Sequence, residues 1–163
     1  MAVASSSRLV GVAAAGAVAG ALLCKDWQVA TVAGQSMQPT LNKNKAAKDQ
    51  VIVDRSMHTA RNASRGDIVV LPSPTNSELI TKRLIGDERD WLYSRQGKLV
   101  RVPTSHVWVE GDNAGNSNDS NSFGAVPRSA LQGKVVAKVW PLSEANVFTP
   151  TIDFARFLSP PRP

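Results

Sequence analysis

The chain has 163 residues, 42% of them hydrophobic and 20% charged, a composition typical of one globular domain with a sizeable core. Its formal net charge of +6 comes from scattered lysines and arginines, and only 6% of residues are aromatic, which favours a basic surface over a nucleic-acid-binding face. Cys24 is the only cysteine, so an internal disulfide and a cysteine-based zinc site are excluded. We therefore expect no metal, no cofactor and no nucleic-acid partner.

The first element in chain order is an apolar segment. Residues 9–24 carry no charge and lie between Arg8 and Lys25. As a helix this segment would be about 24 Å long, which is short against a hydrocarbon core of about 30 Å. We expect a retained single-pass anchor in contact with membrane lipid, with a cleavable signal, a transit peptide and a core helix as the alternatives. Residues 1–28 are accordingly assigned to an N-terminal tail and membrane anchor.

The rest of the chain contains short apolar runs that are rich in β-branched residues. The runs cover residues 29–32, 51–53, 68–71, 79–85, 99–102, 107–109 and 135–139. Polar or proline-rich stretches separate them, and strands do not alternate with long helices. The pattern predicts a mostly β domain over residues 29–142. Residues 143–163 are predicted to form a peripheral C-terminal tail with a short helix near residues 152–158.

A serine follows the anchor in a loop rich in turn-forming residues. Residues 34–41 read Gly-Gln-Ser-Met-Gln-Pro-Thr-Leu, which places the hydroxyl of Ser36 close to the membrane. A lone serine is usually a surface or turn residue, and it acts as a nucleophile only when a base activates it. Ser36 is therefore a candidate nucleophile whose base must come from elsewhere in the chain.

The run at residues 79–85 offers that base. Strand alternation puts Lys82 on a face with apolar neighbours and Arg83 on the opposite face. Desolvation would lower the pKa of Lys82 and let its amine accept a proton, whereas Arg83 is expected to be solvated. His58 and His106 compete as the general base of a triad, but their surroundings mark neither of them. Lys82 is the favoured base.

A loop dense in small polar residues, residues 111–124, directly follows the predicted strand that ends at residue 110. A purely structural loop of Asx turns would explain it, and its spacing does not follow a calcium-binding EF-hand. A hydroxyl from Ser117 or Ser120 could hold a neutral lysine amine in position. The residues alone leave the choice between these two serines open.

In this order and spacing, residues 36–41, 65–70, 82–86 and 111–124 resemble the signal peptidase I family of serine/lysine endopeptidases. The resemblance extends over roughly residues 29–140. It implies a signal-peptidase-like β domain preceded by a membrane helix, with no cofactor. It implies Ser36 as nucleophile, Lys82 as general base and Ser117 as the hydroxyl that orients Lys82. The supporting residues that it implies are Met37, Gly111, Asp112 and Asp119, which would line or shape the site.

Within the family, the compact size and residues 107–112 and 119–124 are most similar to the members of the mitochondrial inner membrane. This implies a catalytic domain facing the intermembrane space, a heterodimer with a homologous subunit, and removal of sorting presequences from imported precursor proteins. Bacterial relatives carry arginine where this chain has Asn121, so we expect Asp119 to depend on neutral hydrogen bonds. Some relatives place an oxyanion-binding hydroxyl where this chain has Gly34, which leaves the Ser36 N–H as the expected donor.

Three other readings compete with this one. A bacterial-type or thylakoid signal peptidase I would share the chemistry but differ in membrane and substrates. A LexA-like self-cleaving repressor also uses a serine and a lysine, but an apolar segment stands where its DNA-binding module would be. A noncatalytic membrane adaptor subunit could retain the motifs as structure, although the intact pair of Ser36 and Lys82 argues against it.

Overall fold

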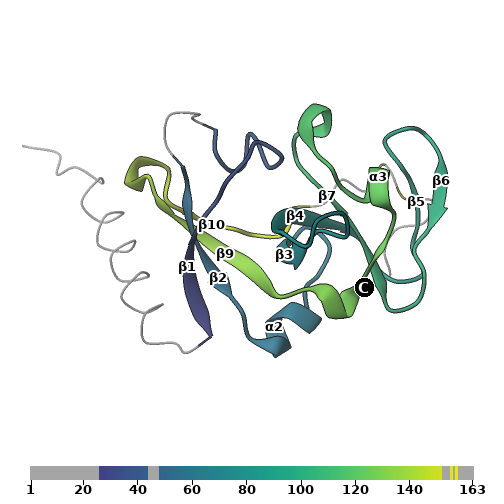
Figure 1. The fold of residues 1–163 in the computed structure, drawn as a ribbon, viewed down its shortest axis with the longest axis horizontal. Helices are drawn as coiled ribbons and strands as arrows, with labels where there is room; N and C mark the ends of the chain where they lie inside the picture. Colours follow the sequence, from purple (N-terminus) through teal and green to yellow (C-terminus); the bar gives the residue numbers. More distant parts are fainter. Residues whose placement is uncertain (1–25, 44–47, 152–154, 156, 158–163) are drawn as a thin grey trace, which may run out of the picture.

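The computed structural model describes residues 26–43, 48–151, 155 and 157, and these form mainly β-strands (Figure 1). The strands are β1 (Trp27–Thr31), β2 (Gln50–Asp54), β3 (Ile68–Pro72), β4 (Leu79–Gly86), β5 (Trp91–Tyr93), β6 (Leu99–Arg101), β7 (His106–Glu110), β8 (Val126–Pro127), β9 (Gly133–Trp140) and β10 (Asn146–Val147). The short helices are α2 (Met57–Arg61) and α3 (Ser120–Phe123), with 3-10 turns η1 (Ala114–Asn116), η2 (Arg128–Ala130) and η3 (Leu142–Glu144). Each predicted strand run overlaps one of these strands, so the prediction of a mostly β domain is confirmed.

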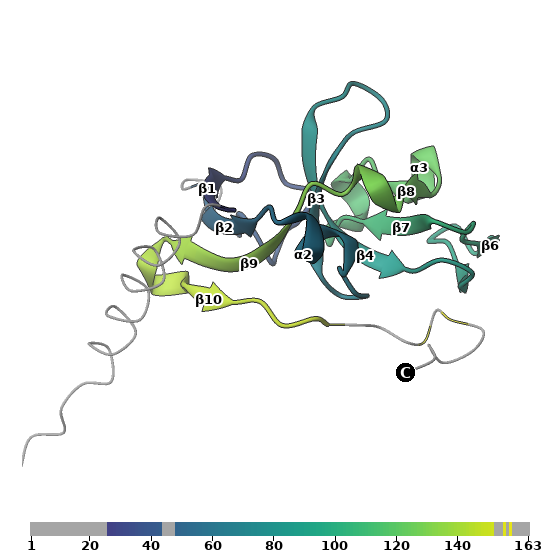
Figure 2. The same cartoon turned by 90° about the horizontal axis from the view of Figure 1, so that it is seen from below.

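The strands form one large antiparallel sheet and one separate hairpin. The sheet has the order β1-β2-β9-β3-β4-β7-β8, with β10 pairing with β9, and the hairpin consists of β5 and β6. Irregular register between β2 and β9, and between β4 and β7, bends the sheet. In Figure 1 the β5–β6 hairpin lies beside α3, and in both views β6 lies at the opposite end of the molecule from β1 and β10 (Figures 1 and 2). The hairpin therefore lies next to the polar loop that follows β7.

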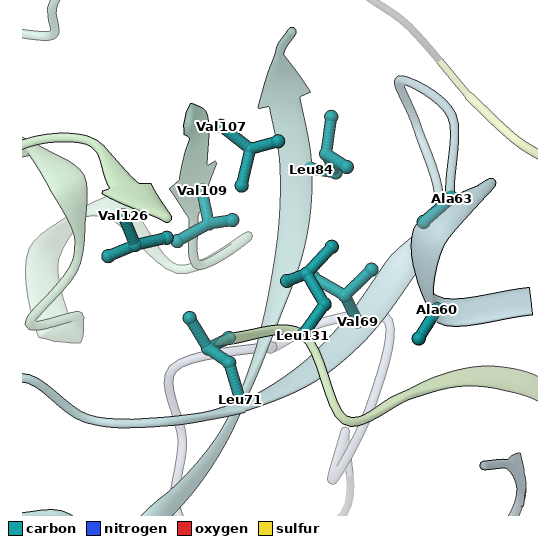
Figure 3. Packing of buried hydrophobic residues seen from close by; sticks show 9 residues of the cluster. All are labelled: Ala60, Ala63, Val69, Leu71, Leu84, Val107, Val109, Val126 and Leu131. Atoms are coloured by element: carbon teal, nitrogen blue, oxygen red, sulfur yellow. The ribbon is translucent and has the colours of Figure 1, made fainter. Parts of the chain in front are cut away.

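Two apolar clusters share strand β3, because its alternate side chains face opposite ways. Val69 and Leu71 belong to the first cluster, whereas Ile68 belongs to the second. The first cluster (Figure 3) consists of Ala60, Ala63, Val69, Leu71, Leu84, Val107, Val109, Val126 and Leu131. The second packs beneath the loop that follows β1 and consists of Val32, Met37, Leu41, Val51, Val53, Ile68 and Val135. The loop that carries Ser36 is thus anchored by core residues on both sides of the serine.

Some predictions fall on residues that the structure does not describe. The predicted anchor at residues 9–24 lies outside the described residues, and so does most of the predicted helix near residues 152–158. Among the residues described here, no helix is both long and apolar enough to cross a membrane. Beyond the predicted domain end at residue 142, β10 pairs with β9 and Phe148 packs against the second cluster. This part of the chain extends the sheet.

The side chain of Asn42 closes the loop between β1 and β2. Its amide nitrogen donates to the carbonyl oxygens of Val32 (3.0 Å) and Gly34 (2.9 Å), and its amide oxygen accepts from the N–H of Asp49 (2.8 Å). The backbone N–H of Asn42 donates to the Asp49 carboxylate at 2.8 Å. Asn42 also has a φ of 54°, in the left-handed region that asparagine tolerates better than most residues. This network fixes the course of the chain on both sides of Ser36.

Replacing Asn42 with alanine is expected to lower the free energy of unfolding by about 2–3 kcal/mol, because buried backbone groups would lose their partners. Denaturant titration of the full chain in detergent measures this loss. Asn76→Ala is the matched control, since the Asn76 amide bonds only in an exposed turn with Glu78. Equal stability losses in the two variants would contradict a special role for Asn42.

Candidate active site

Ser36 opens onto a cleft of about 450 Å³ between the β1 side of the sheet and the start of β4. Residues that line the cleft include Ala30, Val32, Gly34, Ser36, Met37, Val51, Val53, Val70, Leu79, Ile80 and Thr81. Within the described part of the chain, neither the hydroxyl nor the backbone N–H of Ser36 donates a hydrogen bond. Met37 is only 3% exposed, so it packs into the second cluster while it lines the cleft beside Ser36. Neighbouring core residues thus fix the position of Ser36, and its hydroxyl and N–H can still donate hydrogen bonds to a molecule in the cleft.

Lys82 projects from β4 into the interior. Its relative exposure is 3%, and Leu84, two residues along the same face, is fully buried. Burial lowers the pKa of Lys82, the negative charge of Asp119 opposes that shift, and the positive charge of Arg95 adds to it. No hydrogen bond or ion pair joins the Lys82 amine to another described residue, and no fully buried side-chain nitrogen of the described chain lacks a partner, so the small exposed part of Lys82 includes its amine. Lys82 is therefore largely desolvated, as the strand alternation predicted.

Gly111 is the point where the separate parts of the site meet. In the register of β4 and β7, Arg83 pairs with Glu110, so Lys82 and Gly111 come next to each other just beyond that pair. A Cβ atom at Gly111 would collide with the carbonyl oxygen of Ser36 and with the side chain of Ser117. Only a residue without a side chain lets the serine loop and the polar loop approach this closely. The arrangement brings together Ser36, Lys82, Gly111 and Ser117.

The two candidate serines of the polar loop have different surroundings. The hydroxyl of Ser117 donates to Asp119 Oδ2 at 2.7 Å, and its side chain lies against the position that a Gly111 Cβ would take. Ser120 is 1% exposed, and its hydroxyl accepts a hydrogen bond from the N–H of Val109 at 3.0 Å. Ser117 is thus the serine beside Ser36, whereas Ser120 supports strand β7.

Asp119 is buried and fully engaged. Its carboxylate accepts hydrogen bonds from the N–H of Gly111 (2.9 Å), from Ser117 and from Asn121, and it forms an ion pair with Arg95 Nη1 at 3.0 Å. Burial by itself would raise the pKa of Asp119, but the hydrogen bonds from Gly111, Asn121 and Ser117 bring it below the usual value. The expectation that Asp119 depends on neutral hydrogen bonds alone was wrong. Arg95, from the turn of the β5–β6 hairpin, supplies the positive charge.

Asp112 lies on the other side of β4 from Lys82. Its carboxylate forms a two-pronged pair with Arg83 (2.8 and 2.7 Å) and accepts a hydrogen bond from Thr40. Arg83 also donates to the carbonyl oxygen of Gly66, and its side chain is only 14% exposed. The expectation of a solvated Arg83 was therefore wrong, because a carboxylate pairs with it across the strand. Asp112 ties β4 to the serine loop instead of lining the wall next to Lys82.

The histidines have local partners. His58 lies exposed on α2 within hydrogen-bonding distance of the Asn62 amide, and His106 Nδ1 lies 2.9 Å from the carbonyl oxygen of Thr104. Among the described residues, neither histidine makes a hydrogen bond to Ser36. Lys82, which the register of β4 and β7 places next to Gly111, remains the favoured base candidate.

The chain belongs to the signal peptidase family, peptidase S26, whose model matches residues 6–100 and 87–140. It is 39% identical to mitochondrial inner membrane protease subunit 2 of Danio rerio, over 76% of this chain and 70% of that protein. It is 43% identical to subunit 2 of Mus musculus (69% and 67% covered) and 39% identical to subunit 1 of Schizosaccharomyces pombe (71% and 74%).

These comparisons confirm the predicted resemblance to the signal peptidase family and to the mitochondrial inner membrane proteases, and membership implies peptidase activity. Among solved structures, a signal peptidase I from Enterococcus faecalis matches with a TM-score of 0.40 and 24% identity. That match covers 45% of this chain and 96% of the other.

Replacing Gly111 with alanine is expected to lower kcat/KM by about 10²-fold or more, because the added methyl group pushes the Ser36 carbonyl and Ser117 apart. Steady-state cleavage of a presequence peptide measures this effect. Gly115→Ala is the matched control from the same loop, since its nearest neighbour, Asn113 Oδ1, lies 4.0 Å from the new Cβ atom. Similar kinetics for the two variants would argue against a crowded junction at Gly111.

Proposed function

We propose that this chain is a membrane-tethered serine endopeptidase in which Ser36 is the nucleophile and Lys82 the general base. One observation carries the proposal: Lys82 is only 3% exposed and its amine has no hydrogen-bond partner among the described residues, directly beside the glycine that contacts Ser36 and Ser117. A lysine is costly to bury in this way unless its neutral form is used. Catalytic hydrogen bonds are often absent before substrate binds, so the free serine and amine are compatible with this role.

In the proposed reaction, Ser36 Oγ attacks the scissile carbonyl carbon while its proton passes to the neutral amine of Lys82. The tetrahedral intermediate collapses as the C–N bond breaks, and the Lys82 ammonium gives its proton to the leaving amine. A water molecule, deprotonated by Lys82, then attacks the ester on Ser36 and releases the second product. Lys82 returns the proton to the serine oxygen, so that the site is restored and no cofactor takes part.

Ser117 is proposed to orient the amine of Lys82. Because the Ser117 hydroxyl donates its proton to Asp119, its oxygen can act toward Lys82 only as an acceptor. An amine N–H that points at Ser117 leaves the lone pair of Lys82 free to face Ser36. The unused backbone N–H of Ser36 is the first candidate donor for the oxyanion. Gly34 has no hydroxyl, so a second donor would come from other backbone groups.

The cleft gives the proposed substrate a place to bind. Strand β1 is the edge of the sheet, and the first residues of β4 form the opposite wall of the cleft. An extended peptide could pair its main chain with such an edge and place alternate side chains against the apolar wall. We propose precursors with small residues one and three positions before the cut, as the family resemblance implies.

The relatives support a location for this reaction. Because the chain is similar to both subunits of the mitochondrial inner membrane protease, we propose that it forms a heterodimer with a homologous subunit 1. The segment at residues 9–24 would anchor it in the inner membrane by a single pass, with the catalytic domain in the intermembrane space. There it would remove sorting presequences from imported proteins.

The test is cleavage by the assembled pair in liposomes, with the catalytic serine of the partner replaced so that any cutting comes from this chain. Two precursors are compared, one with alanine and one with leucine immediately before the cut, and mass spectrometry identifies the new N-terminus. We expect one defined cut in the alanine precursor and at least about 10-fold slower cutting of the leucine precursor. If cutting requires the partner's intact serine, the chain is a noncatalytic subunit and the proposal is wrong.

A further inference from the structure

The turn between β5 and β6 reaches the polar loop through a single arginine. Arg95 Nη1 pairs with Asp119 at 3.0 Å, and Arg95 Nη2 pairs with Glu110 at 3.2 Å and donates to the carbonyl oxygen of Gly111. The backbone N–H of Arg95 donates to Asn121 Oδ1 at 2.9 Å. One guanidinium and one peptide group therefore hold both ends of the loop segment that contains Ser117.

The hairpin that carries Arg95 is itself fixed in place. Leu92 is fully buried and packs with Val102 and Trp108 beneath the hairpin. The turn is closed by a hydrogen bond from the Ser94 N–H to the Lys98 carbonyl (2.8 Å), and Gly97 takes a positive φ of 75°. Arg95 is thus presented on a rigid turn instead of a free loop, which suits a role in positioning other groups.

The charges around Arg95 are unusual. The side chains of Asp119 and Glu110 are 1% and 2% exposed, and Arg95 is their shared ion-pair partner. Buried carboxylates need such a partner, because the interior does not hydrate them. A guanidinium suits the position, since its fork of N–H groups can contact two carboxylates and a carbonyl oxygen at once.

We propose that Arg95 is a positioning residue, which through Asp119 sets the orientation of the Ser117 hydroxyl and the electrostatic environment of the Lys82 amine. The inference rests on the proposed serine/lysine mechanism. Arg95 fixes the Asp119 carboxylate by an ion pair. Asp119 in turn accepts hydrogen bonds from the Ser117 hydroxyl and from the Gly111 N–H. The lone pairs of the Ser117 oxygen then remain for the Lys82 amine. Asn121 is hydrogen-bonded to both Asp119 and Arg95, so an arginine side chain at residue 121 would start beside the same carboxylate.

The sign of the effect on Lys82 follows from the charges that act on it. Asp119, ahead of α3, favours the ammonium form of Lys82, and Arg95, from the hairpin, disfavours it. Glu110, at the end of β7, adds a second carboxylate that Arg95 holds. Arg83 points to the opposite face of β4, where Asp112 pairs with it. Loss of the Arg95 charge would leave the carboxylates uncompensated and raise the pKa of Lys82.

The experiment compares the pH dependence of kcat/KM for the assembled membrane pair, with the partner's catalytic serine replaced throughout. Arg95→Gln is expected to move the acidic limb upward by about one pH unit, so that activity falls roughly 10-fold at neutral pH and recovers at alkaline pH. The double variant Arg95→Gln with Asn121→Arg should bring the limb back toward that of the wild type. Arg101→Gln is the matched control on the same hairpin, because Arg101 is exposed and lies against Trp91.

The inference would be overturned if the acidic limb of the pH profile is unchanged in Arg95→Gln. It would also be overturned if Arg95→Gln lowers kcat/KM equally at every pH and the added Asn121→Arg substitution does not restore it. If Arg95→Gln does not yield folded protein, the double variant decides. A folded double variant with the wild-type limb supports the positioning role, and a double variant that also fails to fold rejects it. The Ser36→Ala variant gives the background cleavage rate of the assay. Cutting by Ser36→Ala would refute the proposed function itself, whereas an inactive Ser36→Ala beside an unshifted Arg95→Gln would refute this inference alone.

Discussion

Replacing Lys82 with methionine is expected to abolish peptide cleavage and to stabilise the folded protein at the same time. Methionine fills a similar volume on the same buried face of β4 but has no amine to accept the proton of Ser36. Loss of a general base alone lowers the rate by about 10²–10⁴-fold. Because the Lys82 side chain is only 3% exposed and its amine has no hydrogen-bond partner among the described residues, its removal should raise the free energy of unfolding by about 1–3 kcal/mol.

The stability gain of Lys82→Met should depend on pH in a direction that can be measured. Burial lowers the pKa of Lys82 below the ordinary value of 10.5, so at pH values under the folded-state pKa the protein buries an ammonium group. That destabilisation is fully present in this acidic range and disappears as the pH rises toward 10.5, where the unfolded chain also loses the proton. The stability gain of Lys82→Met should therefore be largest below the folded-state pKa of Lys82 and shrink as the pH rises from that pKa toward 10.5.

Thermal melts of wild type and Lys82→Met across this pH range, together with cleavage assays, measure both effects. Lys134→Met is a suitable control, because Lys134 is half-buried and its amine forms an ion pair with Asp67 at 2.9 Å. That variant should lose stability and keep its cleavage chemistry. A Lys82→Met protein that is less stable than wild type, or that still cleaves, would show that Lys82 is a structural cation.

The strands and the buried face of β4 were predictable because both follow from local alternation of apolar and polar residues. Lys82 stands between Ile80 and Leu84 in that pattern, and no long-range contact is needed to place it. The short strands β5, β8 and β10 were not predicted, because none of them contains an apolar run with β-branched residues. β10 in particular forms only through pairing with β9.

The ion pairs could not be predicted, because they depend on which segments the fold brings together. Arg95 is separated from Asp119 by 24 positions, and only the packing of the hairpin beside α3 makes them neighbours. Arg83 was expected to be solvated because its partner, Asp112, comes from the far end of β7. Local alternation predicts which way a side chain points from a strand, but it does not predict which charge lies opposite.

Replacing Ser36 with alanine is expected to abolish cleavage at every pH, by at least about 10⁴-fold, while leaving the stability within about 0.5 kcal/mol of wild type. The Ser36 hydroxyl makes no hydrogen bond with any described residue, so its loss leaves no buried partner unsatisfied. Ser120→Ala gives the opposite combination. Its hydroxyl accepts from the buried N–H of Val109, so this variant should lose about 1–2 kcal/mol of stability and retain most of its activity.

Cleavage assays and denaturant titrations on both serine variants separate the two roles. Loss of a nucleophile lowers the cleavage rate and leaves the stability unchanged, whereas loss of a structural hydroxyl lowers the stability and leaves the cleavage rate unchanged. Persistent cleavage by Ser36→Ala at any pH would place the nucleophile elsewhere, and a stability loss comparable to that of Ser120→Ala would make Ser36 a structural residue. The prediction follows from where each hydroxyl lies: Ser36 opens onto the cleft, whereas Ser120 is engaged with the backbone of β7.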